Sequence, residues 1–334
     1  MAVAGAREHA GVDDRATRPA GDGTARPAGE GPTPLRPPAS ERERVGFAAV
    51  LDVARSAGLA TTGAGVWRAG SAVLVGLPSV PALARVDDPV RAADAERQVS
   101  VSSLLAARGV PAVRTIGPHA QPVPTPAGPV TVWEWVPADG PPVGAREIGH
   151  AARRLHDTTR DVIGLVVDHD PLEVVAAELA RARRSGGTPA ADVALLDAVR
   201  ERLAQNWPQP ADDPLGGALV HGDLHRGNVI AGREGVVLAD LELSGWGPGS
   251  ADVAPQLVAV RRYGGDPAEL EAFLAGYGAD PRGWDGLEVL VEGYELWVAA
   301  WAVANRAASP RIEHEAEVRL RRWRGGEQRV WSLR

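Results

Sequence analysis

The residues best suited to chemistry lie in one polar stretch and in a short segment that follows it. The stretch reads His221-Gly222-Asp223-Leu224-His225-Arg226-Gly227-Asn228, and the segment reads Asp240-Leu241-Glu242. Asn228 and Asp240 carry hard oxygen donors, and Mg²⁺ is usually held by one or two carboxylates together with substrate phosphates. Asp223 would then accept the proton of an acceptor hydroxyl. This role depends more on the position of the carboxylate than on its basicity. The pattern therefore predicts magnesium-assisted phosphoryl transfer.

A different metal chemistry is the alternative for the same stretch. His221, Asp223 and a distant histidine such as His314 have the composition of an iron-binding facial triad, as in metal-dependent oxygenases. That hypothesis gives no role to Asn228 or Asp240, and it requires a different scaffold from the helical one that the C-terminal half predicts.

Short apolar runs position the polar stretch. Runs at 218–220, 229–231 and 236–239 predict the strands of a short sheet, and the polar residues follow the ends of these strands. Loops held by strands are a common way for a rigid scaffold to present reactive side chains. The remainder of this half predicts helices at 145–158, 172–184, 190–205, 251–263, 267–277, 284–307 and 313–323.

The N-terminal half predicts a smaller α+β lobe at residues 41–136. It begins with the capping-box pattern Ser40-Glu41-Arg42-Glu43 of a helix that runs to about residue 59. Apolar runs separated by turn residues predict strands at 66–68, 71–77, 81–86, 112–116 and 130–136, with a helix inserted at 88–109.

Three further segments complete the predicted organisation. The Pro- and Gly-rich residues 137–142 predict a hinge, and residues 143–334 a second, mostly helical lobe. Residues 1–40 are rich in Ala, Gly, Pro and Arg without apolar periodicity, which predicts a disordered tail.

Composition excludes several functional classes. All 36 Lys+Arg residues are arginine, so Schiff-base chemistry and a P-loop lysine are excluded. Because there is no cysteine, disulfides, thiolate nucleophiles and iron–sulfur clusters are excluded as well. The net charge of −7 argues against nucleic acid as a partner. The chain has no run of about 18 apolar residues and no secretory signal, so we expect no membrane partner and a cytoplasmic location.

The motif from His221 to Asn228, followed by Asp240-Leu241-Glu242 and then by Asp252, resembles the aminoglycoside phosphotransferase and choline kinase group of protein-kinase-like enzymes. The resemblance extends over residues 45–334. It implies a bilobal α+β fold, with a small antiparallel-sheet N-lobe for the nucleotide and a larger, mostly helical C-lobe. It also implies transfer of the γ-phosphoryl group of ATP, with Mg²⁺, to a hydroxyl of a small molecule such as an antibiotic, a sugar or an amino alcohol.

The resemblance assigns roles to individual residues. It implies that Asp223 is the catalytic base, that His225 contacts phosphate and that Asp252 braces the catalytic loop. Asn228 and Asp240 would bind magnesium. The nucleotide would be held by the edge at 133–136, which includes Glu134 and Val136, and by Ser71 in the poor glycine-rich lid Gly70-Ser71-Ala72.

Two positions depart from the family pattern. Arg85 stands where the family usually has a phosphate-gripping lysine, and Gln98 stands where a helix glutamate usually pairs with that lysine. Arginine can donate two parallel hydrogen bonds to phosphate oxygens, so we expect Arg85 to bind the phosphates of the nucleotide. The departures also motivate an alternative function, a degenerate kinase fold that binds a nucleotide or metabolite without turnover.

The acidic residues Glu288, Glu292 and Glu295 share one face of a predicted C-terminal helix. Such a face is usually solvated. An acidic cradle for a cationic acceptor is the less favoured alternative for these three residues.

Overall fold

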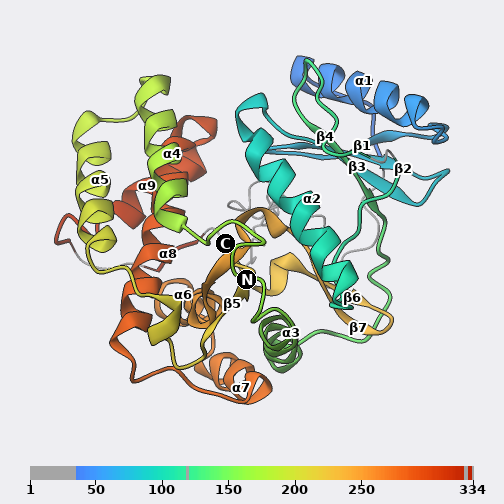
Figure 1. The fold of residues 1–334 in the computed structure, drawn as a ribbon. Helices are drawn as coiled ribbons and strands as arrows, with labels where there is room; N and C mark the ends of the chain where they lie inside the picture. Colours follow the sequence, from blue (N-terminus) through green and yellow to red (C-terminus); the bar gives the residue numbers. More distant parts are fainter. Residues whose placement is uncertain (1–34, 118–119, 327–329, 333–334) are drawn as a thin grey trace, which may run out of the picture.

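The computed structural model describes residues 35–117, 120–326 and 330–332, which form two lobes (Figure 1). Most of the predicted tail, residues 1–34, lies outside the described residues. Its last part is placed against the N-lobe, because Arg36 exchanges two backbone hydrogen bonds with Val66, of 3.0 and 2.8 Å. The described structure thus begins before the helix that the capping box predicts.

An antiparallel four-stranded sheet forms the N-lobe. Its strands are β1 (Gly65–Ala69), β2 (Val73–Leu77), β3 (Ala82–Val86) and β4 (Val130–Glu134), in the order β1-β2-β3-β4. The helix α1 (Glu41–Ser56) lies along one face of the sheet (Figure 1). Every residue of β2 and β3 is buried, which explains their nearly unbroken apolar composition.

The segment at 112–116 is not the strand that its apolar residues predict. Its hydrogen bonds divide between the two lobes, because Val113 N–H donates to Leu238 O while Ile116 N–H donates to Val132 O. Because the segment pairs with two different strands, it forms isolated β-bridges and not a continuous ladder. It instead links the N-lobe sheet to the C-lobe.

The helix α2 (Ala92–Ala107) also connects the lobes. It follows the short 3-10 helix η1 (Pro89–Arg91), which Asp88 caps by accepting a hydrogen bond from Val90 N–H. Figure 1 shows α2 descending from the sheet toward the C-lobe, where it contacts the 3-10 helix η4 (Leu241–Leu243). The end of the motif at Asp240-Leu241-Glu242 is therefore packed against α2.

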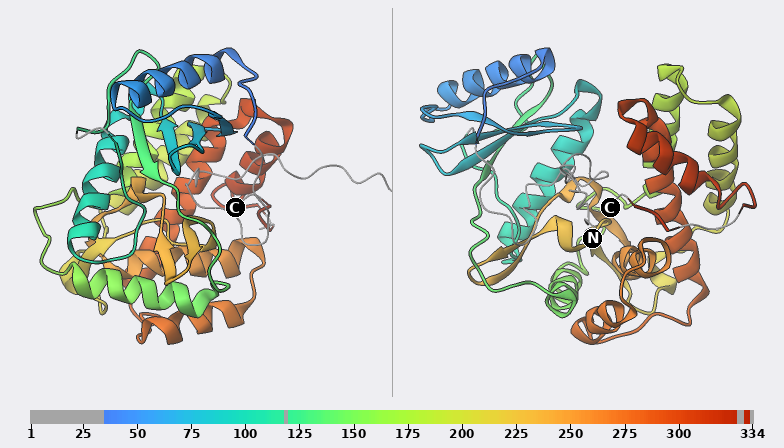
Figure 2. Two further views of the ribbon diagram at one scale, coloured as in Figure 1. Left: turned by 90° about the vertical axis from the view of Figure 1, so that its right-hand side faces the viewer. Right: turned by 180° about the vertical axis from the view of Figure 1, so that it is seen from behind.

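The C-lobe is built around the 20-residue helix α8 (Asp285–Ala304). Helices α4, α5 and α9 group around one end of α8 (Figure 2), and α6 also contacts it. Within the described ranges, no helix is long and apolar enough to cross a bilayer. The remaining helices are α3 (Ala145–Thr158), α4 (Pro171–Ser185), α5 (Ala190–Ala204), α6 (Ala254–Tyr263), α7 (Pro267–Tyr277) and α9 (Pro310–Leu320), with 3-10 helices η2 (Pro210–Asp212), η3 (Arg226–Asn228), η5 (Gly249–Asp252) and η6 (Arg306–Ala308).

Two small antiparallel sheets replace the single short sheet that the sequence predicts. β5 (Gly217–Val220) pairs with β8 (Gly245–Pro248), whereas β6 (Val229–Gly232) pairs with β7 (Gly235–Leu238). The sequence of β8, Gly-Trp-Gly-Pro, has the composition of a turn, which is why it was not predicted as a strand. The polar stretch 221–228 lies between β5 and β6, and Asp240 follows β7.

Glycines allow α3 and α7 to approach closely. A Cβ atom on Gly149 of α3 would lie 2.1 Å from Phe273 O, and one on Gly276 of α7 would lie 2.1 Å from Arg146 O. No real Cβ atom tolerates such a contact with backbone. The packing of these two helices therefore requires glycine at both positions.

We predict that Gly149→Ala lowers the free energy of unfolding by about 1–3 kcal/mol, because the added methyl group forces the two helix backbones apart. Urea denaturation measures the loss. Gly283→Ala is the matched control, since its Cβ would meet no atom within 4 Å, and it should change stability by less than about 0.5 kcal/mol. Equal stability of both variants would contradict the close-packing argument.

Candidate active site

Asp223 lies at the centre of the polar loop that joins β5 to β6. Its side chain is almost fully buried and accepts two hydrogen bonds: Tyr294 Oη donates to Oδ1 at 2.6 Å, and Asn228 Nδ2 donates to Oδ2 at 2.8 Å. Burial and the Asp223 carboxylate raise the pKa of Tyr294, so its hydroxyl stays a proton donor. These two bonds orient the carboxylate while leaving lone pairs for a further donor.

His225 lies beside this carboxylate. Its Nδ1 accepts a hydrogen bond from Gly227 N–H at 2.9 Å, so the proton of a neutral ring sits on Nε2. Nε2 is 3.5 Å from Asp223 Oδ2, and the side chain is partly exposed. His225 thus presents an N–H group at the accessible edge of the loop.

Asp252, in η5, holds the start of the same loop. Oδ1 accepts a hydrogen bond from Gly222 N–H at 2.8 Å and Oδ2 one from His221 N–H at 3.0 Å. His156 Nε2 lies 2.9 Å from Oδ2. Burial opposes the charge of Asp252, but the hydrogen bond from His156 and the nearby imidazoles outweigh it, so its pKa lies below the ordinary value. The brace that the family resemblance implies for Asp252 is present in the structure.

His221 ties the loop to the end of β7. Its Nε2 lies 2.8 Å from Ala239 O, and its Nδ1 faces Asp223 N–H at 3.4 Å. Both ring nitrogens thus face backbone partners, while His314 is exposed on α9. This arrangement gives the iron-site alternative no support.

Asn228 and Asp240 lie side by side across the β6–β7 hairpin. Ala239 N–H donates to Asn228 O at 3.0 Å, which brings the two donors to the same end of the hairpin. Asn228 Nδ2 is fixed by Asp223, while its Oδ1 is buried and accepts no hydrogen bond within the described part of the chain. Hard oxygens of this kind fit Mg²⁺.

The backbone of Asp240 is unusual. Among the described residues it is the one non-glycine residue with a positive φ, at 61°. A left-handed conformation costs free energy in a residue with a Cβ and persists where the surroundings impose it, often at functional sites. Here it turns the chain from β7 into η4 and buries the Asp240 carboxylate beside the loop of Asp223.

Arg85, on β3, points into a cluster of acids. Its Nε lies 2.9 Å from both carboxylate oxygens of Asp87, its Nη2 lies 2.7 Å from Glu242 Oε2, and its Nη1 lies 3.6 Å from Asp240 Oδ1. The side chain is 1% exposed. Burial opposes the guanidinium charge, but the neighbouring carboxylates outweigh it and raise the pKa of Arg85.

Glu242 pairs with Arg85, whereas the resemblance implies a helix glutamate at the position that Gln98 occupies. Arg91 Nη2 donates to its Oε1 at 2.9 Å, and Arg97 Nη1 donates to its backbone oxygen at 3.1 Å. Burial disfavours the carboxylate, yet Arg91 and Arg85 outweigh this and lower the pKa of Glu242. The resemblance implies an ion pair between a cation on a strand and an acid on a helix. Here the ion pair joins Arg85 on β3 to Glu242 on η4.

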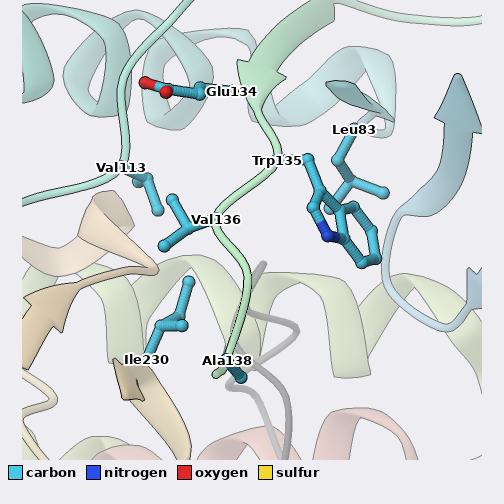
Figure 3. A pocket seen from close by; sticks show the side chains of 7 residues that line it. All are labelled: Leu83, Val113, Glu134, Trp135, Val136, Ala138 and Ile230. Carbon is cyan, nitrogen blue, oxygen red and sulfur yellow. The ribbon is translucent and has the colours of Figure 1, made fainter. Parts of the chain in front are cut away.

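A narrow apolar slot lies where the lobes meet at the end of β4 (Figure 3). Leu83 of β3 and Ile230 of β6 line it from the two lobes. The other lining residues are Val113, Glu134, Trp135, Val136 and Ala138. Val136 lies among these side chains, and it makes no hydrogen bond to another part of the described chain. In Figure 3 the carboxylate of Glu134 lies apart from Val136 and Ile230, and the N–H of Glu134 donates to Arg114 O at 2.7 Å.

The structure brings together five of the predicted site residues: Asp223, His225, Asn228, Asp240 and Arg85. Val136 lines the slot next to β6. Ser71 lies in the exposed turn between β1 and β2, where its carbonyl oxygen accepts a hydrogen bond from Arg42. That bond ties the turn to α1.

Residues 68–290 match the model of the APH phosphotransferase enzyme family. The chain belongs to this family. It is therefore a small-molecule phosphotransferase, and its bilobal α+β architecture is the one that the sequence predicts. The loop around Asp223 and the hairpin that carries Asn228 and Asp240 both fall within the matched residues.

Solved structures share this fold. Aminoglycoside phosphotransferase APH(3'')-Id from Streptomyces rimosus is 20% identical with a TM-score of 0.55, over 76% of this chain and 97% of that one. Choline kinase LicA from Streptococcus pneumoniae is 14% identical with a TM-score of 0.57, over 82% and 98%. A choline/ethanolamine kinase family protein from Mesorhizobium loti is 19% identical with a TM-score of 0.53, over 83% and 93%.

Two features of the site were not predicted from sequence. Tyr294 reaches Asp223 from a helix 71 residues further along the chain, and Glu242, which is not part of α2, pairs with the strand cation Arg85. The only local signal for Tyr294 is a tyrosine within an apolar helix. For Glu242, the sequence shows only its place two residues after Asp240 and gives no sign of a contact with β3.

We predict that Glu242→Gln lowers the free energy of unfolding by about 3–5 kcal/mol, because Arg85 and Arg91 lose a buried counter-charge. Glu288→Gln is the matched control, since Glu288 pairs with Arg261 at the surface, and it should cost less than about 1 kcal/mol. Urea denaturation compares the two variants. Equal losses would show that the buried cluster is no more important than a surface pair.

We also predict a pH signature for Asp252. Because its folded pKa lies below the ordinary value of 3.8, its contribution to stability is present above that value and is lost as the pH falls through the folded pKa. Asp252→Asn should therefore cost at least about 2 kcal/mol at neutral pH, and the difference from wild type should shrink below about pH 4. Unfolding free energies measured across this range test the prediction, and a constant difference down to pH 3 would contradict it.

Proposed function

We propose that the chain transfers the γ-phosphoryl group of ATP to a hydroxyl of a small molecule, with Mg²⁺ as the metal. The observation that supports this best is the convergence of Asp223, Asn228 and Asp240 beside the apolar slot at the lobe junction. Family membership supports the class of reaction. The nucleotide, the metal and the role of each residue belong to the proposal.

The nucleotide base would occupy the slot between Leu83 and Ile230. A flat apolar ring suits such walls, and the free backbone groups of Val136 would supply polar contacts at its edge. Ile230 lies two residues beyond Asn228 on the same strand, so phosphates attached to this base would extend toward the metal donors. A structure of the Streptomyces rimosus relative contains ADP and streptomycin, which supports the binding of a nucleotide and a small molecule.

Asp223 would act as the base. The acceptor oxygen forms a bond to the γ-phosphorus while the bond from that phosphorus to the bridging oxygen breaks, and ADP leaves. The hydroxyl proton passes to the Asp223 carboxylate, which Tyr294 and Asn228 hold in place. His225 presents Nε2–H next to this carboxylate, where it would contact the transferred phosphoryl oxygens.

Charge on the phosphates requires cations. Asn228 Oδ1 and the Asp240 carboxylate would hold Mg²⁺, which neutralises phosphate charge when it is bound. Arg85 remains our candidate for the α/β-phosphates, although its Nε and Nη2 are engaged by Asp87 and Glu242. Nη1, which faces Asp240, is the group that would reach a phosphate.

This engagement of Arg85 also favours a second candidate function. If the guanidinium cannot leave its acidic partners, the fold would bind nucleotide without efficient turnover. The two candidates differ in one measurement, because both require magnesium-dependent nucleotide binding but only the first requires transfer. Ser71 and the backbone of Glu134 would contribute to binding in either case.

We predict that Asp223→Asn lowers kcat for phosphotransfer by about 10²–10⁴-fold, the usual contribution of a positioned base. ADP binding measured by calorimetry should remain nearly unchanged, because Asp223 lies beyond the slot. Asp266→Asn, at the exposed cap of α7, is the matched control and should keep full activity. Equal turnover in wild type and Asp223→Asn would refute the proposed mechanism, and nucleotide binding without any turnover would establish the second candidate.

A further inference from the structure

The last described residues of the chain, 330–332, fold back onto the C-lobe. Trp331 is 3% exposed, and its N–H group donates to Arg262 O near the end of α6 at 2.7 Å. Ser332 donates from its N–H group and from Oγ to the Glu315 carboxylate of α9, at 3.1 and 2.7 Å. The segment is therefore anchored on two helices. It also lies beyond residue 290, where the match to the family ends.

The Trp331 ring packs against a tyrosine and two arginines. The Tyr263 ring meets it edge-on, with the ring centroids 5.6 Å apart. Arg319 Cζ lies 5.1 Å from the centroid of the Trp331 ring, and Arg262 Cζ lies 5.9 Å from it. The face of an indole ring attracts cations, and the attraction is stronger where water is excluded. Trp331 therefore helps to fix the positions of both guanidinium groups.

Both arginines hold α8 close to Tyr294. Arg262 Nε donates at 2.6 Å to Oε1 of Glu295, the residue that follows Tyr294 on the helix. Arg319 Nη1 donates at 2.6 Å to Val298 O, about one helical turn beyond Tyr294. Because Arg262 belongs to α6 and Arg319 to α9, α8 is held from two neighbouring helices at the level of Tyr294.

These contacts are removed from water. Glu295 and Arg319 are both fully buried, so the expectation that this helix face is solvated is wrong for Glu295. Buried charges depend strongly on their partners, since the loss of one leaves the other uncompensated. Arg319 Nη2 also donates to Tyr263 Oη at 3.2 Å. Burial is the main cause of the raised pKa of Tyr294, and Tyr263 and Arg319 both act on it as well, so both lie within electrostatic range of its hydroxyl.

Resting on the function proposed above, we propose that the end of the chain positions the catalytic base. The device is the C-terminal clamp, by which we mean Trp331, Arg262 and Arg319 together. By fixing α8, the clamp keeps Tyr294 Oη at 2.6 Å from Asp223 Oδ1. A hydrogen bond weakens steeply when its geometry is lost, so the orientation of the carboxylate depends on the position of this helix. Trp331 is thus a positioning residue that acts through Tyr294.

A measurement that does not depend on turnover tests the clamp. The chain has three tyrosines, so the full-length protein labelled with ¹³C at tyrosine Cζ gives three signals, and Tyr294→Phe identifies the one of interest. Its chemical shift responds to the hydrogen bonding of the hydroxyl. Asp223→Asn gives the shift of a Tyr294 that has lost its charged acceptor. We expect Trp331→Ala to move the signal in the same direction, and Trp331→Phe, which keeps an aromatic ring, to leave it closer to wild type.

Trp67→Ala is the matched control. Trp67 is also a buried tryptophan, with Trp135 edge-on at 5.6 Å and Arg68 Cζ at 6.0 Å from its ring centroid. It lies on β1 in the other lobe. Its loss should therefore leave the Tyr294 signal unchanged.

Ser332→Ala is a milder variant that keeps the test valid if Trp331→Ala does not fold. It removes the hydroxyl that donates to Glu315 and leaves the Trp331 ring intact. We expect it to move the Tyr294 signal in the same direction as Trp331→Ala, by a smaller amount.

Turnover connects the clamp to catalysis. Transfer of labelled γ-phosphate from ATP with magnesium is measured with water, streptomycin and choline as acceptors. Trp331→Ala should lower kcat about tenfold or more, while the Kd of ADP measured by calorimetry stays unchanged. In a Tyr294→Phe background, Trp331→Ala should lower kcat no further, because both substitutions remove the same hydrogen bond to Asp223. A merely structural role would instead add its loss to that of Tyr294→Phe.

The outcomes separate the clamp from the function on which it rests. An unchanged Tyr294 signal in Trp331→Ala and Ser332→Ala would overturn the clamp, whatever the turnover. A moved signal with full kcat, or a further loss of kcat in the double variant, would overturn its role in positioning the base while leaving phosphotransfer supported. A moved signal in a protein that transfers phosphate to none of the three acceptors would support the clamp and overturn phosphotransfer.

Discussion

The buried ion cluster around Arg85 is the interaction on which the arrangement of the two lobes depends. Its guanidinium, on β3, contacts Asp87 in its own lobe and Glu242 two residues after Asp240, while Arg91 at the start of α2 contacts Glu242 as well. Charges removed from water in this way are stable only in each other's presence, since the loss of one partner leaves another uncompensated. The cluster therefore couples the position of the N-lobe sheet to the conformation of the segment that carries Asp240. In a chain without lysine, the wide fork of arginine makes several such contacts possible from one side chain.

The loop that carries Asp223 depends on a different kind of support. Asp252 accepts hydrogen bonds from two successive backbone N–H groups of the loop, and Tyr294 and Asn228 then orient Asp223 through its two oxygens. These contacts come from η5, from α8 and from the loop itself. Because each donor has one well-placed acceptor, the carboxylate of Asp223 is held in a single orientation before any ligand arrives. Such preorganisation is the property that positions a base for proton transfer.

Local patterns predicted the parts of the structure that depend on local physics. The bounds of α3 and α7 agree with the sequence because helical periodicity and capping residues lie within each segment. Asp223, Asn228 and Asp240 were correctly expected close together because a short loop and a hairpin connect them. The contact of Arg85 with Glu242 joins residues 157 positions apart, and that of Tyr294 with Asp223 joins residues 71 apart. Such contacts depend on how helices and lobes pack against each other. The sequence pattern of neither segment predicts that packing. The same reason explains why Glu295, which is fully buried and pairs with Arg262, was expected in solvent. It also explains why residues 112–116 were expected to form a regular strand.

The strand β6 has a consequence for the nucleotide proposed above. Asn228, the proposed metal donor, immediately precedes this strand, and Ile230, which forms one wall of the slot, lies within it. The two residues are therefore separated by two steps along the chain, roughly 7 Å. Leu83, on the opposite wall, belongs to the other lobe. Movement of the lobes relative to each other would change how tightly the slot encloses a ring, but it would not change this separation. For the nucleotide position proposed above, β6 would therefore set the length of the ligand: the distance between its ring and its anionic group would have to match this separation.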